Sequence, residues 1–198
     1  MIWVWYILGF AFLTSLFVLG KRKGAHKRRE LFNTPPPEAW RPTLGRTLPM
    51  VENLSASEWR QLAGYMQVFL AEKRFEGCGG LVLTEEMMVT VAAQACLLLL
   101  GRETRVYPKL KTILLYPDTY AYEGQARLGE SWTCGVVVLA WNSVQGGARN
   151  FADGQNVTFH EFAHQLDQQD GAGDGAPILE DRSAYAAWAR VLGDEFNV

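Results

Sequence analysis

An uncharged segment near the N-terminus dominates this sequence. Residues 2–20 carry no charged side chain, and Thr14 and Ser15 are the only polar side chains in the run apart from amphipathic aromatic rings. As a helix rising about 1.5 Å per residue, the segment is roughly 28 Å long, close to the roughly 30 Å hydrocarbon core of a bilayer. The segment therefore predicts a transmembrane helix, and the rest of the chain is left to form a separate domain.

Aromatic and basic residues flank this segment as they flank a membrane anchor. Trp3, Trp5 and Tyr6 stand at its start, where amphipathic rings favour the headgroup boundary. Six bases follow at once: Lys21, Arg22, Lys23, Lys27, Arg28 and Arg29. Because bases are retained on the cytoplasmic side, we expect the N-terminus outside and the domain in the cytoplasm. A cleaved signal peptide and a buried core helix are the alternatives, and the lack of a basic n-region argues against the first.

Charge is distributed unevenly along the chain. Residues 30–198 hold 13 of the 19 bases and all 21 acids, a net charge of about −8. An acidic body argues against nucleic acid as the main partner, because phosphate neutralisation needs a basic face. Cys78, Cys96 and Cys134 are odd in number and widely spaced, which favours a reducing compartment over a disulfide framework.

The chain is predicted to have two parts. Residues 1–29 form the anchor with its basic juxtamembrane segment, and residues 30–198 form one domain. Near their junction, the stretch Asn-Thr-Pro-Pro-Pro at 33–37 is a stiff extended spacer.

Local patterns in the domain predict a mixture of helices and short strands. Ser55 and Glu58 have the spacing of a capping box, and Thr84 can cap a second helix that is apolar on most faces. Helices are predicted over 55–73, 84–101, 156–168 and 183–196, and strands over 112–116 and 135–141. Because helices and strands do not alternate regularly, the predicted fold class is α+β.

The segment His-Glu-Phe-Ala-His at 160–164 is an HExxH motif, and it contains two of the three histidines in the chain. One helical turn separates His160 from His164, so both imidazoles can reach a single metal ion at about 2.0–2.1 Å each. Glu161 is then placed to act as the base that takes a proton from water at that metal. The sequence therefore predicts a catalytic metal site.

Helical periodicity assigns faces to this motif. The stripe predicted to face the core consists of Phe159, Phe162, Ala163 and Leu166. His160 and His164 lie about 40° apart on another face. Asp167 lies about 20° from His160 and can accept the second ring N–H of a ligating histidine, which would fix its tautomer. A solvated amphipathic helix with two unligated histidines is the alternative.

Six stretches of the chain resemble the Mlc titration factor A family, which are zinc-dependent peptidases of the gluzincin type. These stretches are FEGCGGL (75–81), AAQACLLLL (92–100), ILLYPDT (113–119), GESW (129–132), VVLAW (137–141) and HEFAHQLD (160–167). The resemblance implies a zincin-like core with a short mixed sheet and an active-site helix. It also implies Zn²⁺ held by His160 and His164, with Glu161 as the catalytic base. The default interpretation of the strand at 135–141 is a buried strand. The resemblance also allows it to be the edge strand that aligns an extended peptide by backbone pairing.

A three-ligand catalytic zinc site needs one more protein group. The remaining histidine, His26, lies beside the predicted anchor, so the third ligand is expected to be a carboxylate. In the family this ligand is a glutamate several tens of residues past the motif, beyond Val198, so the sequence resembles a C-terminally truncated member. Asp194 and Glu195 on the predicted last helix are possible substitutes.

The leading functional hypothesis is a membrane-tethered zinc metallopeptidase, aminopeptidase-like by resemblance, that hydrolyses peptide or aminoacyl-amide bonds. We expect it in a bacterial inner membrane as a single-pass protein with the domain in the cytoplasm. The first alternative is a non-catalytic module that sequesters a transcriptional repressor and has a vestigial or incomplete metal site. The second alternative is an inactive fragment.

Overall fold

The computed structural model describes residues 2–101, 105–118, 120–122, 125–127, 129–132, 135–150 and 154–168. Side chains within 119–134 are not described. The elements are, in chain order, α1 (Ile2–Asn33), α2 (Trp40–Thr47), the 3₁₀ helix η1 (Pro49–Asn53), α3 (Ala56–Glu72), β1 (Arg74–Gly77), α4 (Glu85–Leu97), β2 (Thr112–Tyr116), β3 (Tyr120–Tyr122), β4 (Gln125–Arg127), β5 (Gly129–Trp132), β6 (Val136–Ala140), α5 (Trp141–Arg149) and α6 (Val157–Asp167).

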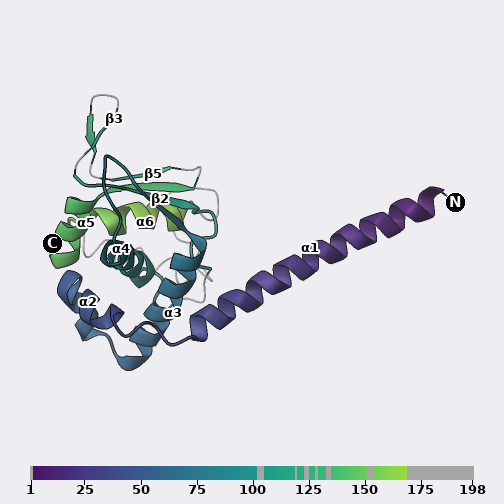
Figure 1. Cartoon of the computed structure of the whole chain (residues 1–198), viewed down its shortest axis with the longest axis horizontal. Helices are drawn as coiled ribbons and strands as arrows, with labels where there is room; N and C mark the ends of the chain where they lie inside the picture. The colour runs from purple at the N-terminus through teal and green to yellow at the C-terminus, as the bar shows by residue number, and fades with distance from the viewer. Residues whose placement is uncertain are drawn as a thin grey trace, which may run out of the picture.

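A small mixed sheet forms one layer of the domain. Its strand order is β1-β2-β6-β5, with β1, β2 and β6 parallel and β5 antiparallel to β6. β3 and β4 form a separate antiparallel pair that projects from the sheet in Figure 1. α6 and α4 lie beneath the sheet, with α2 and α3 further from it (Figure 1). The segregated helices and the mixed sheet confirm the predicted α+β class.

The strand predicted at 135–141 is β6, and it does not lie at the edge of the sheet. β2 pairs with one side of β6 and β5 with the other, so the edge position belongs to β5. The apolar run of β6 explains its place, since Val137 and Leu139 are fully buried and strands covered on both faces lack polar alternation. The default interpretation of 135–141 as a buried strand is therefore confirmed, and the edge placement that the resemblance allowed is wrong.

The α3 and α4 helices begin where their capping residues predict. The Ser55 hydroxyl accepts a hydrogen bond from the Glu58 amide at 3.3 Å, and the Glu58 carboxylate accepts one from the Ser55 amide at 2.8 Å. Thr84 caps α4 by accepting from the amide of Met87 at 3.3 Å. α4 is buried around most of its circumference, as its apolar sequence predicts, but it ends at Leu97, before the predicted stop at Gly101.

α1 is one continuous helix from Ile2 to Asn33, and its first half projects away from the domain (Figure 1). The described part of the chain contains no helix that is both long enough and apolar enough to span a membrane. Many side chains of residues 2–20 lie outside the described set, so the transmembrane anchor stays a prediction.

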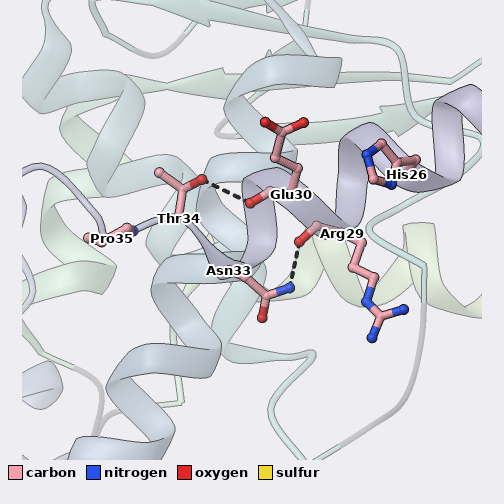
Figure 2. A pocket seen from close by; sticks show the side chains of 6 residues that line it. All are labelled: His26, Arg29, Glu30, Asn33, Thr34 and Pro35. Carbon is pink, nitrogen blue, oxygen red and sulfur yellow. Dashed lines mark hydrogen bonds between the residues drawn. The ribbon is translucent and has the colours of Figure 1, made fainter.

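The domain end of α1 is fixed by its own capping bonds and by α3. Asn33 donates to the Arg29 carbonyl at 2.6 Å and Thr34 donates to the Glu30 carbonyl at 2.8 Å, which satisfies carbonyls of the last turn (Figure 2). The side chain of Gln67 in α3 donates to the Thr34 carbonyl at 2.6 Å. A shallow surface pocket of about 470 Å³ opens at this end of the helix.

Close contact between α1 and α3 depends on Gly64. The Phe32 and Tyr65 rings meet edge to face with centroids 5.1 Å apart, and Arg28 forms an ion pair with Glu72. A Cβ atom on Gly64 would lie 2.6 Å from the Phe32 carbonyl oxygen and 2.8 Å from its ring. Only glycine allows this approach without displacement of α1.

We predict that Gly64→Ala destabilises the chain by about 1–3 kcal/mol, because the added methyl group overpacks the α1–α3 contact. Gly146→Ala is the matched control, since it is also helical and a Cβ atom there would have no neighbour within 4 Å. The control substitution should stabilise the chain by about 0.5–1 kcal/mol, as alanine does in helices. Urea unfolding of both variants checks this, and equal effects would contradict the assigned contact.

Candidate metal centre on α6

Asn156 sets the start of the helix that carries the HExxH motif. Its side-chain oxygen accepts from the Phe159 amide at 2.9 Å, and its carbonyl accepts from the His160 amide at 3.0 Å. This N-cap begins α6 at Val157, so the motif occupies the first two turns of the helix.

His160 and His164 point toward one another from successive turns of α6. Their Nε2 atoms are 3.1 Å apart, their ring centroids are 4.5 Å apart, and the rings are nearly perpendicular. Both side chains are exposed. Two imidazole nitrogens at about 2.0–2.1 Å from one tetrahedral ion stand about 3.3 Å apart, so this donor pair fits a shared zinc ion with little ring movement.

Glu161 differs from the two histidines in its surroundings. Its residue is only 7% exposed, whereas both neighbouring imidazoles of the motif reach solvent. Glu161 is therefore largely buried, although it is adjacent in sequence to exposed His160. Burial of this kind shields a carboxylate from bulk solvent.

The buried face of α6 is rotated relative to the prediction. The buried residues are Thr158, Glu161, Phe162 and Gln165. Ala163 is exposed, and Phe159 and Leu166 are half-buried, so only Phe162 of the predicted core stripe is fully buried. Thr158 and Gln165 take buried positions that the predicted stripe gave to apolar residues, and the buried Thr158 hydroxyl has no hydrogen-bond partner among the described residues.

A polar network joins α6 to α4 and α5. The Asn156 side-chain amide donates to Gln94 Oε1 and to the Gly147 carbonyl, each at 2.9 Å, and Gln94 Nε2 donates to the Val144 carbonyl at 3.4 Å. Gln94 is completely buried. The absence of a side chain at Gly147 is required, since a Cβ there would lie 2.9 Å from Asn156. No local sequence signal marks this contact, because 62 positions separate Gln94 from Asn156.

Phe162 anchors the middle of α6 in the core. Its ring packs against Tyr107 and Phe69, with centroids 5.1 and 5.7 Å away. Tyr107 has a positive φ of 44°, and its backbone is held by the buried Lys73 ammonium, which donates to the Tyr107 carbonyl at 2.7 Å. Burial lowers the pKa of Lys73, and the neighbouring Glu72 carboxylate opposes that shift.

The C-terminus of α6 is held by a cation. Lys109 donates to the Gln168 carbonyl at 2.7 Å, next to the negative end of the helix dipole. Asp167, the last residue of α6, is half-buried, and its predicted contact with a ligating histidine stays a prediction.

A third ligand is not present in the part of the chain that the structure describes. No group of three or more His, Cys, Asp or Glu side chains able to hold a metal occurs among those residues. The predicted substitutes Asp194 and Glu195 lie outside them, together with the predicted helix at 183–196.

A family model described as "Glucose-regulated metallo-peptidase M90" matches residues 22–198 of this chain. The chain belongs to the M90 metallopeptidase family. This membership agrees with the predicted family resemblance, and a metallopeptidase family implies a metal.

Curated relatives also match the chain. An uncharacterized protein of Synechocystis is 39% identical over 185 residues, which cover 86% of this chain and 67% of the relative. Mlc titration factor A of Klebsiella pneumoniae is 29% identical over 164 residues, covering 76% of this chain and 61% of the relative. The protein of the same name from Salmonella arizonae is 26% identical, covering 76% and 64%. This M90 chain thus spans about two thirds of the length of these relatives.

We predict that Asn156→Ala destabilises the domain by about 1–3 kcal/mol, because it removes the N-cap and leaves buried Gln94 without its donor. Asn156→Asp is the informative partner variant: it keeps the capping oxygen but loses the amide that donates to Gln94 and Gly147. Its new carboxylate oxygen also faces the two acceptor oxygens that the amide bonded, so its stability loss reports the broken network together with that repulsion. Urea unfolding quantifies both, and a loss below about 0.5 kcal/mol for Asn156→Ala would contradict the capping role.

Proposed function

We propose that this chain is a zinc-dependent peptidase that hydrolyses peptide or aminoacyl-amide bonds, with His160 and His164 as metal ligands. The observation that carries this proposal is the 3.1 Å separation of the two Nε2 atoms on one exposed face of α6. The family assignment supports it, since M90 members are described as metallopeptidases.

Each residue of the motif has a distinct role in the proposed reaction. Bound zinc would supply Lewis-acid polarisation of the scissile carbonyl and acidify a water molecule. Glu161 accepts the proton of the attacking water at its carboxylate and then delivers it to the departing nitrogen. The third ligand in this proposal is a carboxylate outside the described residues, and Asp167 orients a ligating histidine.

The sheet suggests how a peptide is aligned. β5 has β6 on one side and no neighbouring strand among the described residues on the other, and it contacts α6. An extended peptide can add to such an edge through main-chain hydrogen bonds, which places its carbonyl groups beside the helix. Peptide substrates are therefore favoured over compact small molecules.

A second candidate function rests on the names of the relatives. Several of them are called Mlc titration factor A, a name that refers to another protein, Mlc. By analogy, the domain of this chain would bind a transcriptional repressor, with or without peptidase activity. Metal stoichiometry and turnover of a peptide amide separate a catalytic protein from a purely binding one.

We further propose that residues 2–20 anchor the chain in a bacterial inner membrane with the domain in the cytoplasm. The continuous helix over this uncharged segment and the six bases that follow it support the proposal. Resistance of the full chain to carbonate extraction from membranes tests it, and release into the supernatant would refute it.

We predict that Glu161→Gln lowers kcat for a peptide amide by about 100-fold to 10,000-fold, because the amide cannot accept the proton. Zinc binding by this variant should be unchanged, since Glu161 is not a ligand. Glu38→Gln removes an exposed carboxylate far from the motif in sequence and should leave turnover unchanged.

His164→Ala should lower zinc affinity by about 100-fold or more, because it removes one of two described donors. Isothermal titration with zinc and turnover assays of the full chain check both variants. Unchanged turnover in Glu161→Gln would overturn the proposed base, and unchanged zinc affinity in His164→Ala would overturn the proposed site.

A further inference from the structure

The second half of α1 is a dense and exposed positive segment. Its six bases, at positions 21–29, are all solvent-exposed, and no acid interrupts them. Of these bases, Arg28 forms an ion pair with Glu72 of α3. We call residues 21–29 the basic segment. It spans about 12 Å along the helix axis.

The first half of the same helix exposes large aromatic side chains. Trp3, Tyr6 and Phe10 are 79%, 70% and 72% exposed, and their spacing places them on one face of α1. Nothing in the described part of the chain covers them. Apolar surface of this extent next to a basic segment is typical of a helix that meets a membrane.

The position of the basic segment is fixed by how α1 joins the domain. The Phe32–Tyr65 contact, the Arg28–Glu72 pair and the Gln67 bond to Thr34 attach the end of α1 to α3. The remaining helix projects from the domain as a straight extension (Figure 1). The basic segment therefore lies between the exposed aromatic half of α1 and the acidic body of residues 30–198.

This order of charges matches one kind of partner. An anionic surface attracts the basic segment and repels the body, whose net charge is about −8. The attraction of the basic segment and the repulsion of the body favour the same orientation only when the surface lies at the aromatic end of α1. The pocket at the other end suits an anion less well, because Glu30 lies beside Arg29 and His26 in its lining (Figure 2).

We propose that the basic segment binds the phosphate headgroups of anionic phospholipids in a bilayer. Guanidinium groups bind phosphate oxygens in pairs, and lysine ammonium groups add point charges within a Debye length of the surface. The inference deepens the proposed membrane anchoring, and it is independent of peptidase activity. It identifies lipid charge as the property that α1 recognises.

Flotation of the full chain with vesicles tests this inference. Vesicles of phosphatidylcholine alone are compared with vesicles that contain about 30% phosphatidylglycerol, an anionic lipid. We expect the anionic vesicles to raise the partition coefficient at least about tenfold, since each base near such a surface contributes roughly fivefold. The gain should disappear in about 1 M salt, where the Debye length falls to about 3 Å.

A triple variant locates the effect. Lys21→Gln, Arg22→Gln and Lys23→Gln together should lower the preference for anionic vesicles by roughly 100-fold, since they remove three of the six bases. The control carries Arg60→Gln, Lys111→Gln and Arg149→Gln, which remove the same charge from exposed positions of the body and should keep the preference. Lys21→Arg with Lys23→Arg retains the charge and should also keep it.

The outcomes separate this inference from the anchor. Equal partitioning into both vesicle types would overturn lipid-charge recognition and leave the anchor intact. Absence from both vesicle types would overturn the two together. If the control variant loses the preference for anionic vesicles as fully as the triple variant does, the assignment to the basic segment is overturned.

Discussion

The arrangement of the site depends on the packing of one aromatic side chain. Phe162 lies between the two histidines of the motif in sequence, and its ring is wedged against Phe69 and Tyr107 in the core. Because a helix cannot bury one face without turning the opposite face outward, this contact directs His160 and His164 toward solvent. Glu161, between them in sequence, is largely buried. The rotation of α6, and with it the chemistry of the motif, follows from the aromatic cluster.

Polar restraints at both ends of α6 complement this apolar contact. The Asn156 cap with buried Gln94 holds the first turn, and Lys109 holds the last carbonyls. Packing alone would let the helix slide along its axis, whereas directed hydrogen bonds at the ends prevent translation. Metal ligands need such restraint, since a donor displaced by an ångström no longer reaches the ion.

Local signals in the sequence were sufficient for much of the fold. The capping box at Ser55, the cap at Thr84, the strand at Thr112–Tyr116 and the α6 helix are encoded by residues within a few positions of each other. The α+β class and the metallopeptidase family followed from these patterns and the motif. The predicted roles of His160, Glu161, His164 and Asp167 remain to be measured. Features that depend on tertiary pairing were not predictable from local sequence. They are the elements β1, α2 and α5, the interior position of β6 in the sheet, and the contact of Gln94 with Asn156.

The uninterrupted α1 helix has a geometric consequence for any surface that holds its outer end. A flexible linker would let the domain rotate freely relative to the surface. A continuous helix that is docked on α3 fixes both the rotation of the domain about the helix axis and its distance from the surface. Each residue inserted between positions 20 and 28 would swing the domain by about 100° around the helix axis and raise it by about 1.5 Å. The number of residues in this stretch thus sets the rotation of the domain about the α1 axis, and with it which side of the domain faces the surface.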